Sequence, residues 1–210
     1  GAGMSIHESQ SRLWESVVGR SLPFWRFYYP KLAKAFPKFK KVGLNDFYRA
    51  INKVQPSLIR TEADEVTYNL HIMVRFDIEA GLLEDKVTAG ELPEVWNTRY
   101  ESDLGVTPPN HSAGVMQDVH WYTGLVGYFE CYALGNLLSS QIYGAAVKKE
   151  PAIAAEIGKG KFETLRSWLT ENIYRHGNKF TTVELLKRNW LGDMEVEPFM
   201  KPVALGRNNG

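Results

Sequence analysis

The sequence predicts an all-α protein of seven or more helices with little or no sheet. Apolar residues recur at helical spacing through most of the chain, as in the set Leu92, Val95, Trp96 and Tyr100. Capping residues stand before these segments, and glycine or proline follows their ends. Only residues 62–83 alternate in the manner of a strand.

Composition excludes several classes of protein. The 210 residues carry 25 basic and 24 acidic side chains, so the formal charge of +1 gives no electrostatic basis for a nucleic-acid or anionic-membrane partner. The single cysteine, Cys131, excludes a disulfide framework and a zinc site built from cysteines. No apolar run reaches the ~18 residues of a membrane span, and the first residues show no signal peptide. We therefore expect one domain in the cytoplasm.

The N-terminal part predicts two helices. Ser5-x-x-Glu8 matches a capping box, in which the two side chains bond to the first backbone N–H groups of a helix. Gly19 is placed to end that helix. Ser21 then caps a second helix, which we expect to stop at Pro30.

Two helices are expected between residues 46 and 83. Asn45 caps a short one over residues 46–54. Residues 62–83 alternate like a strand, but a strand of ~15 residues would be unusually long. The length of the segment and the plausible cap at Thr61 favour a helix that is apolar nearly all round and therefore buried.

The helix that begins near Leu92 should end at Gly105, and residues 107–114 (TPPNHSAG) form a loop. A long helix covers residues 129–145 and stops before Pro151.

Two more helices follow. One covers residues 162–173 and is closed by Gly177. The other begins at the capping box Thr181-x-x-Glu184 and ends at Gly192.

Simple catalytic motifs are absent from the chain. The sequence has no phosphate-cradling glycine loop, no G-x-S-x-G turn and no H-x-x-x-H pair among its five histidines. From composition and spacing alone, the chain is a helical domain of unassigned function.

Four strings take the interpretation further: HESQSRLWE at 7–15, IRTEADE at 59–65, GVMQDVHW at 114–121 and GYFECYALGN at 127–136. Together and in this order they resemble the carboxypeptidase Taq family of zinc metallocarboxypeptidases, over essentially the whole chain. The resemblance implies an all-α, zincin-type peptidase that releases single amino acids from peptide C-termini.

The resemblance also implies a metal site. In the family, zinc (with cobalt possible) is held by two histidines of an H-E-x-x-H helix and by the glutamate of the HES string, which is Glu8 here. Two imidazoles and one carboxylate leave a position for a water molecule whose pKa the metal lowers. The glutamate of H-E-x-x-H then takes the proton from that water.

The sequence contains no H-E-x-x-H, so residues 1–210 resemble only the C-terminal portion of the catalytic domain. One carboxylate cannot hold zinc usefully, and we expect the isolated chain to be inactive and without metal. Its expected partners are peptide substrates, the missing N-terminal half and a second copy in a homodimer. We also expect uncovered apolar faces, for example around Leu13, Trp14 and Val17.

Arg60 is the candidate for recognising the free carboxylate of the peptide, because its planar guanidinium can bind a carboxylate through two N–H groups. The alternative is a buried ion-pair network with neighbouring acidic residues at the start of a helix. Gln117 and Asp118 are counted with Arg60 as substrate-binding residues, and they could also orient His120.

His120 is the candidate donor to the developing oxyanion or to the substrate backbone; the alternative is a core histidine packed on Trp121. Tyr132, preferred over Tyr128, could donate to the oxyanion, although both could be core aromatics with one wet end. The family usually has a Pro-Thr-like pair where this chain has Glu130-Cys131.

A non-enzymatic function competes with this assignment. The chain could serve as a helical peptide-binding or interaction module that keeps Arg60 but not the chemistry. The two hypotheses differ in whether an H-E-x-x-H segment precedes the chain.

Overall fold

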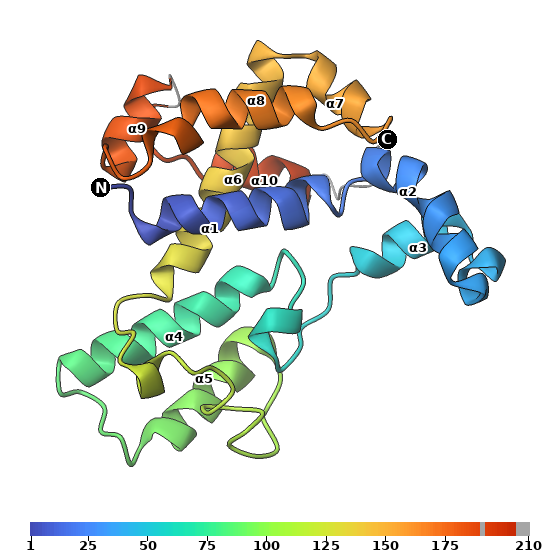
Figure 1. The fold of residues 1–210 in the computed structure, drawn as a ribbon. Helices are drawn as coiled ribbons and strands as arrows, with labels where there is room; N and C mark the ends of the chain where they lie inside the picture. Colours follow the sequence, from blue (N-terminus) through green and yellow to red (C-terminus); the bar gives the residue numbers. More distant parts are fainter. Residues whose placement is uncertain (190–191, 205–210) are drawn as a thin grey trace. The chain divides into compact units, whose positions relative to one another are not determined.

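The computed structural model describes residues 1–189 and 192–204, and every regular element in those ranges is helical. The chain divides into two compact units, which are described separately (Figure 1). Unit 1 comprises residues 1–52 and 134–210, and unit 2 comprises residues 53–133. The predicted all-α class is confirmed.

Unit 1 contains most of the helices. They are α1 (Met4–Arg12), the π-helix η1 (Leu13–Val18), α2 (Leu22–Ala35), the 3-10 helix η2 (Pro37–Lys41), α3 (Leu44–Ile51), α6 (Glu130–Lys149, from residue 134 on), α7 (Ala152–Ile157), α8 (Glu163–Asn172), the 3-10 helix η5 (Tyr174–His176), α9 (Thr182–Arg188) and α10 (Glu197–Ala204).

The core of unit 1 forms where α1 and η1 pack with α6, α7, α8 and α9. Leu13 is completely buried there, and Trp14 packs against the same cluster. The expectation of an uncovered face around Leu13, Trp14 and Val17 is therefore wrong. Burial of these side chains against α6 and α8 supplies the hydrophobic stabilisation that holds α1 in place.

The start of α1 differs from the prediction. The helix begins at Met4 with Gly3 as N-cap, so Ser5 lies inside it and no capping box forms with Glu8. The Gly3 N–H donates to Thr182 Oγ1 at 3.1 Å, which fixes the backbone two residues before the predicted cap. Gly19 does follow the last helical turn, at the end of η1.

The predicted end of the second helix is wrong. Ser21 caps α2 as predicted, by accepting from the Phe24 N–H, but α2 continues through Pro30 to Ala35. Pro30 has no N–H to donate within the helix. The neighbouring Tyr29 hydroxyl donates to the carbonyl groups of Phe39 and Val42, and this contact holds α2 to the segment that follows it.

The third helix is α3, which begins at Leu44 with Gly43 as N-cap rather than at Asn45, and it ends at Ile51.

The C-terminal helices match the predictions closely. Both bonds of the capping box between Thr181 and Glu184 are present, and Gly177 follows η5 with a positive φ of 51°. However, α9 ends at Arg188 and not at the predicted Gly192. Residues 190 and 191 lie outside the described ranges.

Unit 2 is built on two long helices packed together, α4 (Tyr68–Leu83) and α5 (Leu92–Leu104), seen in green in Figure 1. Two 3-10 helices, η3 (Arg60–Glu62) and η4 (Trp121–Thr123), and the first residues of α6 complete it. Val74, Trp96 and Tyr100 are buried between α4 and α5. The helix predicted to end at Gly105 does so, with this glycine at φ 68°.

The alternating segment is a helix, as preferred, but it begins at Tyr68 and not at residue 62. Asp64 is the side chain that organises its start: Oδ1 accepts from the N–H groups of Val66 and Thr67, and Oδ2 accepts from the Thr67 hydroxyl. Thr61 is exposed and lies in η3. The N-cap of α4 is Thr67, so the predicted cap was six residues too early.

No helix among residues 1–189 and 192–204 is long and apolar enough to cross a membrane.

Candidate functional site

Six of the seven predicted site residues lie together in unit 2, and the seventh, Glu8, lies on α1 in unit 1. The six come from three separate strings of the sequence and are Arg60, Gln117, Asp118, His120, Tyr128 and Tyr132.

Arg60 is buried, and two of its nitrogens donate hydrogen bonds to Asp118. Its Nη2 donates to Asp118 Oδ1 at 2.6 Å, and its Nε lies 3.1 and 3.2 Å from the two carboxylate oxygens. Its Nη1 donates to the Tyr68 hydroxyl at 2.6 Å. The guanidinium also lies over the Tyr132 ring, 4.7 Å from its centroid.

The ion pair sets the charge state of both groups. Burial lowers the pKa of Arg60, but the hydrogen bond and charge of Asp118 outweigh it and raise that pKa above its usual value. Burial raises the pKa of Asp118, but the bonds to Arg60 and the charge of Arg75 pull it below its usual value. Arg60 and Asp118 are therefore both ionised at neutral pH.

Arg75 is a residue that the sequence analysis missed. It lies in the middle of α4, is 0% exposed, and its Nε donates to Asp118 Oδ2 at 2.7 Å. Its other nitrogens donate to Gln117 Oε1, the His71 carbonyl group and the Tyr100 hydroxyl. The sequence did contain a signal for this residue. Arg75 lies within a helix predicted to be buried on all sides, and a buried charge needs a partner.

Gln117 holds the loop before η4 against both arginines. Its Oε1 accepts from the Arg60 backbone N–H at 3.0 Å and from Arg75 Nη2 at 2.9 Å. Its Nε2 donates to two backbone carbonyl groups, those of Leu58 and Ala113. These four bonds make Gln117 a support for the arginines, and none of them orients His120.

His120 is buried, and its Nε2 forms a hydrogen bond of 2.9 Å with the Tyr132 hydroxyl. Its Nδ1 is buried without a hydrogen-bond partner among the described residues and lies 3.9 Å from Asp118 Oδ1, too far for a bond. Burial lowers the pKa of His120, so the imidazole is neutral at pH 7.

Aromatic rings surround His120. Its ring centroid lies 4.4 Å from that of Phe129 and 5.6 Å from those of Tyr128 and Tyr132. Of the two candidate tyrosines, Tyr132 is the one with a hydrogen bond to the histidine. Glu130 and Cys131 lie in the first turn of α6, which continues through Tyr132.

A second neutral imidazole lies beside the arginines. His71 is completely buried on α4, and its Nδ1 lies 3.0 Å from the Tyr100 hydroxyl. Burial lowers its pKa to about 4, and the charges of Arg75 and Arg60 act in the same direction. Positive charge in this cluster is thus carried by the arginines alone.

Glu8 is half-buried in the second turn of α1, where it cannot cap the helix. The side chain rests on α6: a Cβ added to Gly135 would lie 2.8 Å from both Cβ and Cγ of Glu8. No group of three or more histidine, cysteine, aspartate or glutamate side chains able to hold a metal is found within residues 1–189 and 192–204. The donor chemistry of Glu8 fits one carboxylate ligand of a zinc site, and other ligands are needed to complete one.

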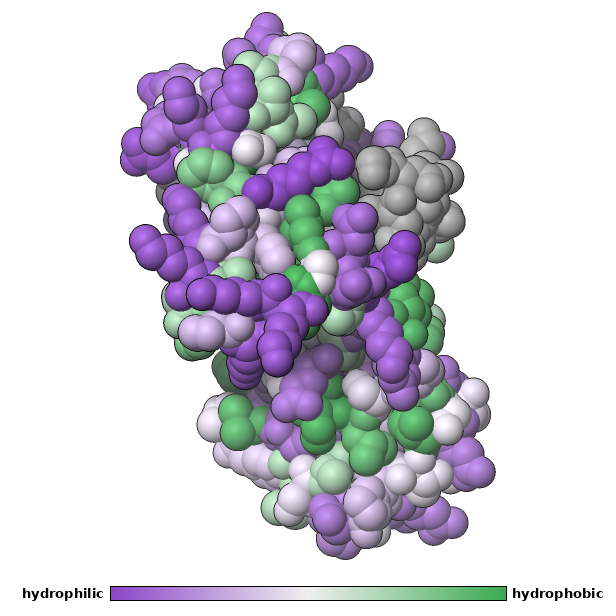
Figure 2. Space-filling view, turned by 90° about the vertical axis from the view of Figure 1, so that its right-hand side faces the viewer, coloured by the Kyte–Doolittle hydropathy of each residue, from purple (hydrophilic) through white to green (hydrophobic). Residues whose placement is uncertain are grey.

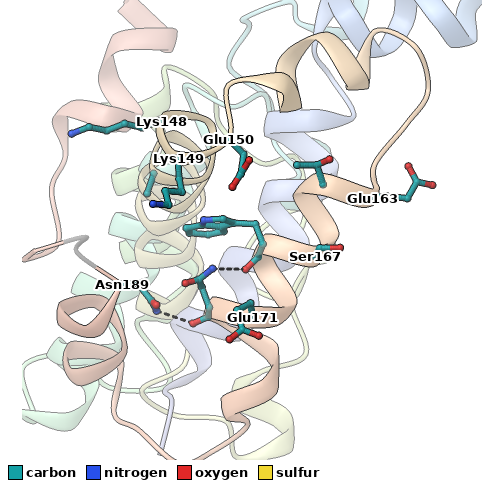
Figure 3. Close-up of a pocket in the computed structure, with 11 residues that line it drawn as sticks. Lys148, Lys149, Glu150, Glu163, Ser167, Glu171 and Asn189 are labelled. Atoms are coloured by element: carbon teal, nitrogen blue, oxygen red, sulfur yellow. Dashed lines mark hydrogen bonds between the residues drawn. The ribbon is translucent and has the colours of Figure 1, made fainter.

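Unit 1 also has a cavity of about 900 Å³ between α6 and α8 (Figure 3). Lys149 at the end of α6 and Glu150 just after it border the cavity, with Ser167 and Glu171 from α8 and Asn189 beyond α9. None of the predicted site residues lines this cavity.

Comparison with known proteins identifies the family. A sequence model of the carboxypeptidase Taq (M32) metallopeptidases matches residues 1–204. The chain belongs to the M32 family. This confirms the resemblance inferred from the four strings.

Two curated relatives illustrate the similarity. The chain is 43% identical over 188 residues to carboxypeptidase 1 of Bacillus subtilis and 44% identical over 197 residues to thermostable carboxypeptidase 1 of Thermus thermophilus. The alignments cover 89% and 94% of this chain but only 38% and 39% of those proteins. The chain thus spans about two fifths of the length of these M32 relatives.

Solved M32 structures have the same fold. The M32 carboxypeptidase from Deinococcus radiodurans superimposes with a TM-score of 0.93 at 42% identity, and the Pyrococcus furiosus carboxypeptidase with a TM-score of 0.94 at 40% identity. Each match covers 99% of this chain and 42% of the other.

Proposed function

We propose that residues 1–210 form the C-terminal portion of an M32 metallocarboxypeptidase that releases single C-terminal amino acids from peptides. The observation that carries this is the cluster in unit 2, in which Arg60 from one family string meets Asp118 and His120 from another, in contact or within 4 Å. An exopeptidase must distinguish a chain end from an internal peptide bond, and the cluster contains the charge for that task.

The charge balance supports recognition of a carboxylate. Arg60 and Arg75 share the single carboxylate of Asp118, so this group carries one positive charge in excess. Glu79, another carboxylate on α4, accepts hydrogen bonds from the Trp121 indole and the Gly127 N–H. Arg60 would receive the peptide carboxylate, with Asp118 and Gln117 holding its guanidinium in place.

His120 and Tyr132 would act at the scissile carbonyl. Both carry a hydrogen-bond donor, they bond to each other at 2.9 Å, and burial strengthens such bonds. Either could donate to the oxyanion as it develops. Tyr128, at the edge of the same aromatic cluster, is the second candidate for this role.

Glu8 would be one of three protein ligands of the metal, with two histidines of an H-E-x-x-H helix supplied from outside this chain. Zinc, or cobalt in its place, would activate a water molecule as nucleophile when bound. We therefore propose that the isolated chain lacks both stoichiometric metal and activity. Metal analysis together with release of an amino acid from a blocked dipeptide checks this; zinc with turnover would contradict it.

The proposed partners follow from the same assignment. They are peptide substrates, the N-terminal part of the same enzyme and a second copy in a homodimer, in a cytoplasmic setting. "Complete enzyme" below means this chain joined to the segment that precedes it in the family. The alternative remains a non-catalytic helical peptide-binding module, which would bind peptide carboxylates without hydrolysis.

Recognition through Arg60 can be tested in the complete enzyme with paired substrates. We expect Arg60→Lys to raise KM by at least tenfold for a peptide with a free C-terminus, because a lysine cannot form the paired bonds of a guanidinium. The matched control is Arg99→Lys, whose arginine pairs with Asp77 and Asp103 at the surface and should leave KM unchanged.

A substrate with an amidated C-terminus gives the second readout. The unaltered enzyme should have a much higher kcat/KM for the peptide with a free C-terminus than for the amide. Arg60→Lys should reduce the ratio between these two values. An unchanged preference in a folded Arg60→Lys enzyme would show that another group recognises the carboxylate.

A further inference from the structure

Small side chains are buried on both α1 and α6. On α1 and η1 the buried positions Ser5, Ser9 and Ser16 recur on one face. On α6 the buried residues include Gly135 and Ser139. Small residues allow two helix backbones to approach closely, so the position of α1 is set by the surface of α6.

Gly135 is the point of closest approach to Glu8. A Cβ at Gly135 would lie 2.8 Å from Glu8 Cβ and Cγ and 3.1 Å from the Glu8 carbonyl carbon. Ordinary carbon–carbon contacts begin at about 3.5 Å. The side chain and the backbone of Glu8 thus occupy the space that any other residue at position 135 would need.

The backbone conformation does not explain this glycine. Gly135 lies inside α6 and is not among the glycines with positive φ. A glycine in the middle of a helix costs about 0.5–1 kcal/mol relative to alanine. The requirement that remains is space for Glu8.

Asn136, the residue after Gly135, makes a second contact with α1. Asn136 Oδ1 accepts from Arg12 Nε at 2.6 Å, and Arg12 lies one turn after Glu8 on α1. Both side chains are buried. A close contact at Glu8 and a hydrogen bond one turn later together determine the depth and the rotation of α1 on α6.

We propose that Gly135 is a positioning residue for Glu8, with Asn136 holding the register of α1. This rests on the proposed function, in which Glu8 is a metal ligand. Metal–ligand distances tolerate only about 0.2 Å. A methyl group at position 135 would require a displacement of about 0.7 Å to restore ordinary contacts.

The test compares two glycine substitutions on the same helix of the complete enzyme. Gly135→Ala should weaken zinc binding at least tenfold, measured by competition with a chelator. Gly144→Ala is the matched control, because Gly144 is exposed on α6 and a Cβ there meets nothing within 4 Å. Zinc affinity should be unchanged in this control.

A spectroscopic readout separates ligand geometry from folding. With Co²⁺ in place of zinc, Gly135→Ala should alter the visible absorption of the bound ion, whereas Gly144→Ala should not. Circular dichroism of the metal-free variants checks that they fold. If Gly135→Ala does not fold, Asn136→Ala replaces it in the test, because it removes the second contact without adding bulk. This variant should also weaken zinc binding and alter the cobalt spectrum.

Glu8→Ala separates this inference from the function on which it rests. If Glu8→Ala retains full zinc affinity, the assignment of Glu8 as a ligand fails. If Glu8→Ala loses the metal while folded Gly135→Ala keeps the original affinity and cobalt spectrum, the ligand assignment stands and the positioning role of Gly135 is wrong.

Discussion

Two buried arginines that share one carboxylate dominate the chemistry of unit 2. Asp118 receives Arg60 on one oxygen and Arg75 on the other, at 2.6 and 2.7 Å. Removing one partner of a buried ion pair is costly because the remaining charge stays desolvated and uncompensated. Here a single carboxylate compensates two such charges.

We expect Asp118→Asn to destabilise the chain by about 3–5 kcal/mol, the usual cost of breaking a buried pair. Asp103→Asn is the control, because it removes a partly exposed partner of Arg99 and should cost about 1 kcal/mol or less. Urea unfolding of both variants measures the difference. An equally small decrease in the free energy of unfolding for both variants would show that the arginines are solvated and do not depend on Asp118.

The neutral histidines make stability depend on pH. The pKa of His71 is lowered from 6.5 to about 4 in the folded chain, so between these values the unfolded chain binds more protons. Stability should therefore fall as the pH drops from 6.5 towards 4, by roughly 3 kcal/mol at one pKa unit per about 1.4 kcal/mol.

A substitution isolates the contribution of His71. His71→Gln should flatten the pH dependence of the thermal midpoint in this window, and His111→Gln, at an exposed loop position, should leave it unchanged. The same slope in both variants and the unaltered chain would assign the effect to other groups. The lowered pKa of His120 acts in the same direction.

Helix boundaries were harder to predict than the helices themselves. The sequence favours Thr61 as the cap, whereas α4 begins at Tyr68 and the Asp64 side chain accepts from the N–H groups just before it. In the structure, Asp64 is buried and also accepts the N–H of Gln55, so its carboxylate holds two loop segments. That additional bond comes from outside the helix and cannot be seen in local sequence.

The contributions of Asp64 and Thr61 to the stability of the chain can be compared directly. Asp64→Ala should lower stability by about 1–2 kcal/mol, because four hydrogen bonds lose their acceptor, three of them at the start of α4. Thr61→Ala should change it by no more than about 0.5 kcal/mol. Chemical unfolding resolves the difference, and the reverse order would restore Thr61 as the cap.

The alternating pattern of α4 also has a tertiary explanation. The helix buries apolar side chains together with the polar residues His71, Arg75 and Glu79. It also exposes the apolar residues Met73, Phe76 and Leu83, at 57%, 49% and 68% exposure. Residues apolar on both sides of a helix give no clean helical periodicity.

At the scale of the whole chain, many large apolar side chains are exposed among the described residues. Besides the α4 residues, exposed apolar side chains follow one another in the loop around η4 and before α6, at Met116, Val119, Tyr122, Leu125 and Val126. Apolar patches appear in green among hydrophilic side chains in Figure 2, including the part of the view that belongs to unit 2. Such surfaces in the isolated chain favour association.

We expect the isolated chain to self-associate at concentrations of tens of micromolar, as measured by sedimentation. Replacing Phe76 and Leu83 by lysine should reduce this association, whereas Val183→Lys, at an equally exposed position on α9, should not. A monodisperse monomer at high concentration would contradict the expectation. Association reduced equally by all substitutions would indicate a general effect of charge.

The sequence was sufficient for the family, the helical class and the identity of six residues that gather in unit 2, because local strings and helical spacing are properties of short segments. It did not reveal Arg75, which shares the Asp118 carboxylate with Arg60, or the close approach of Gly135 to Glu8. Those depend on contacts between segments distant in the chain: Arg60 meets Asp118 across 58 residues, and Glu8 meets Gly135 through packing of α1 on α6. The packing of the helices alone decides which arginines share the Asp118 carboxylate and which glycine leaves room for Glu8.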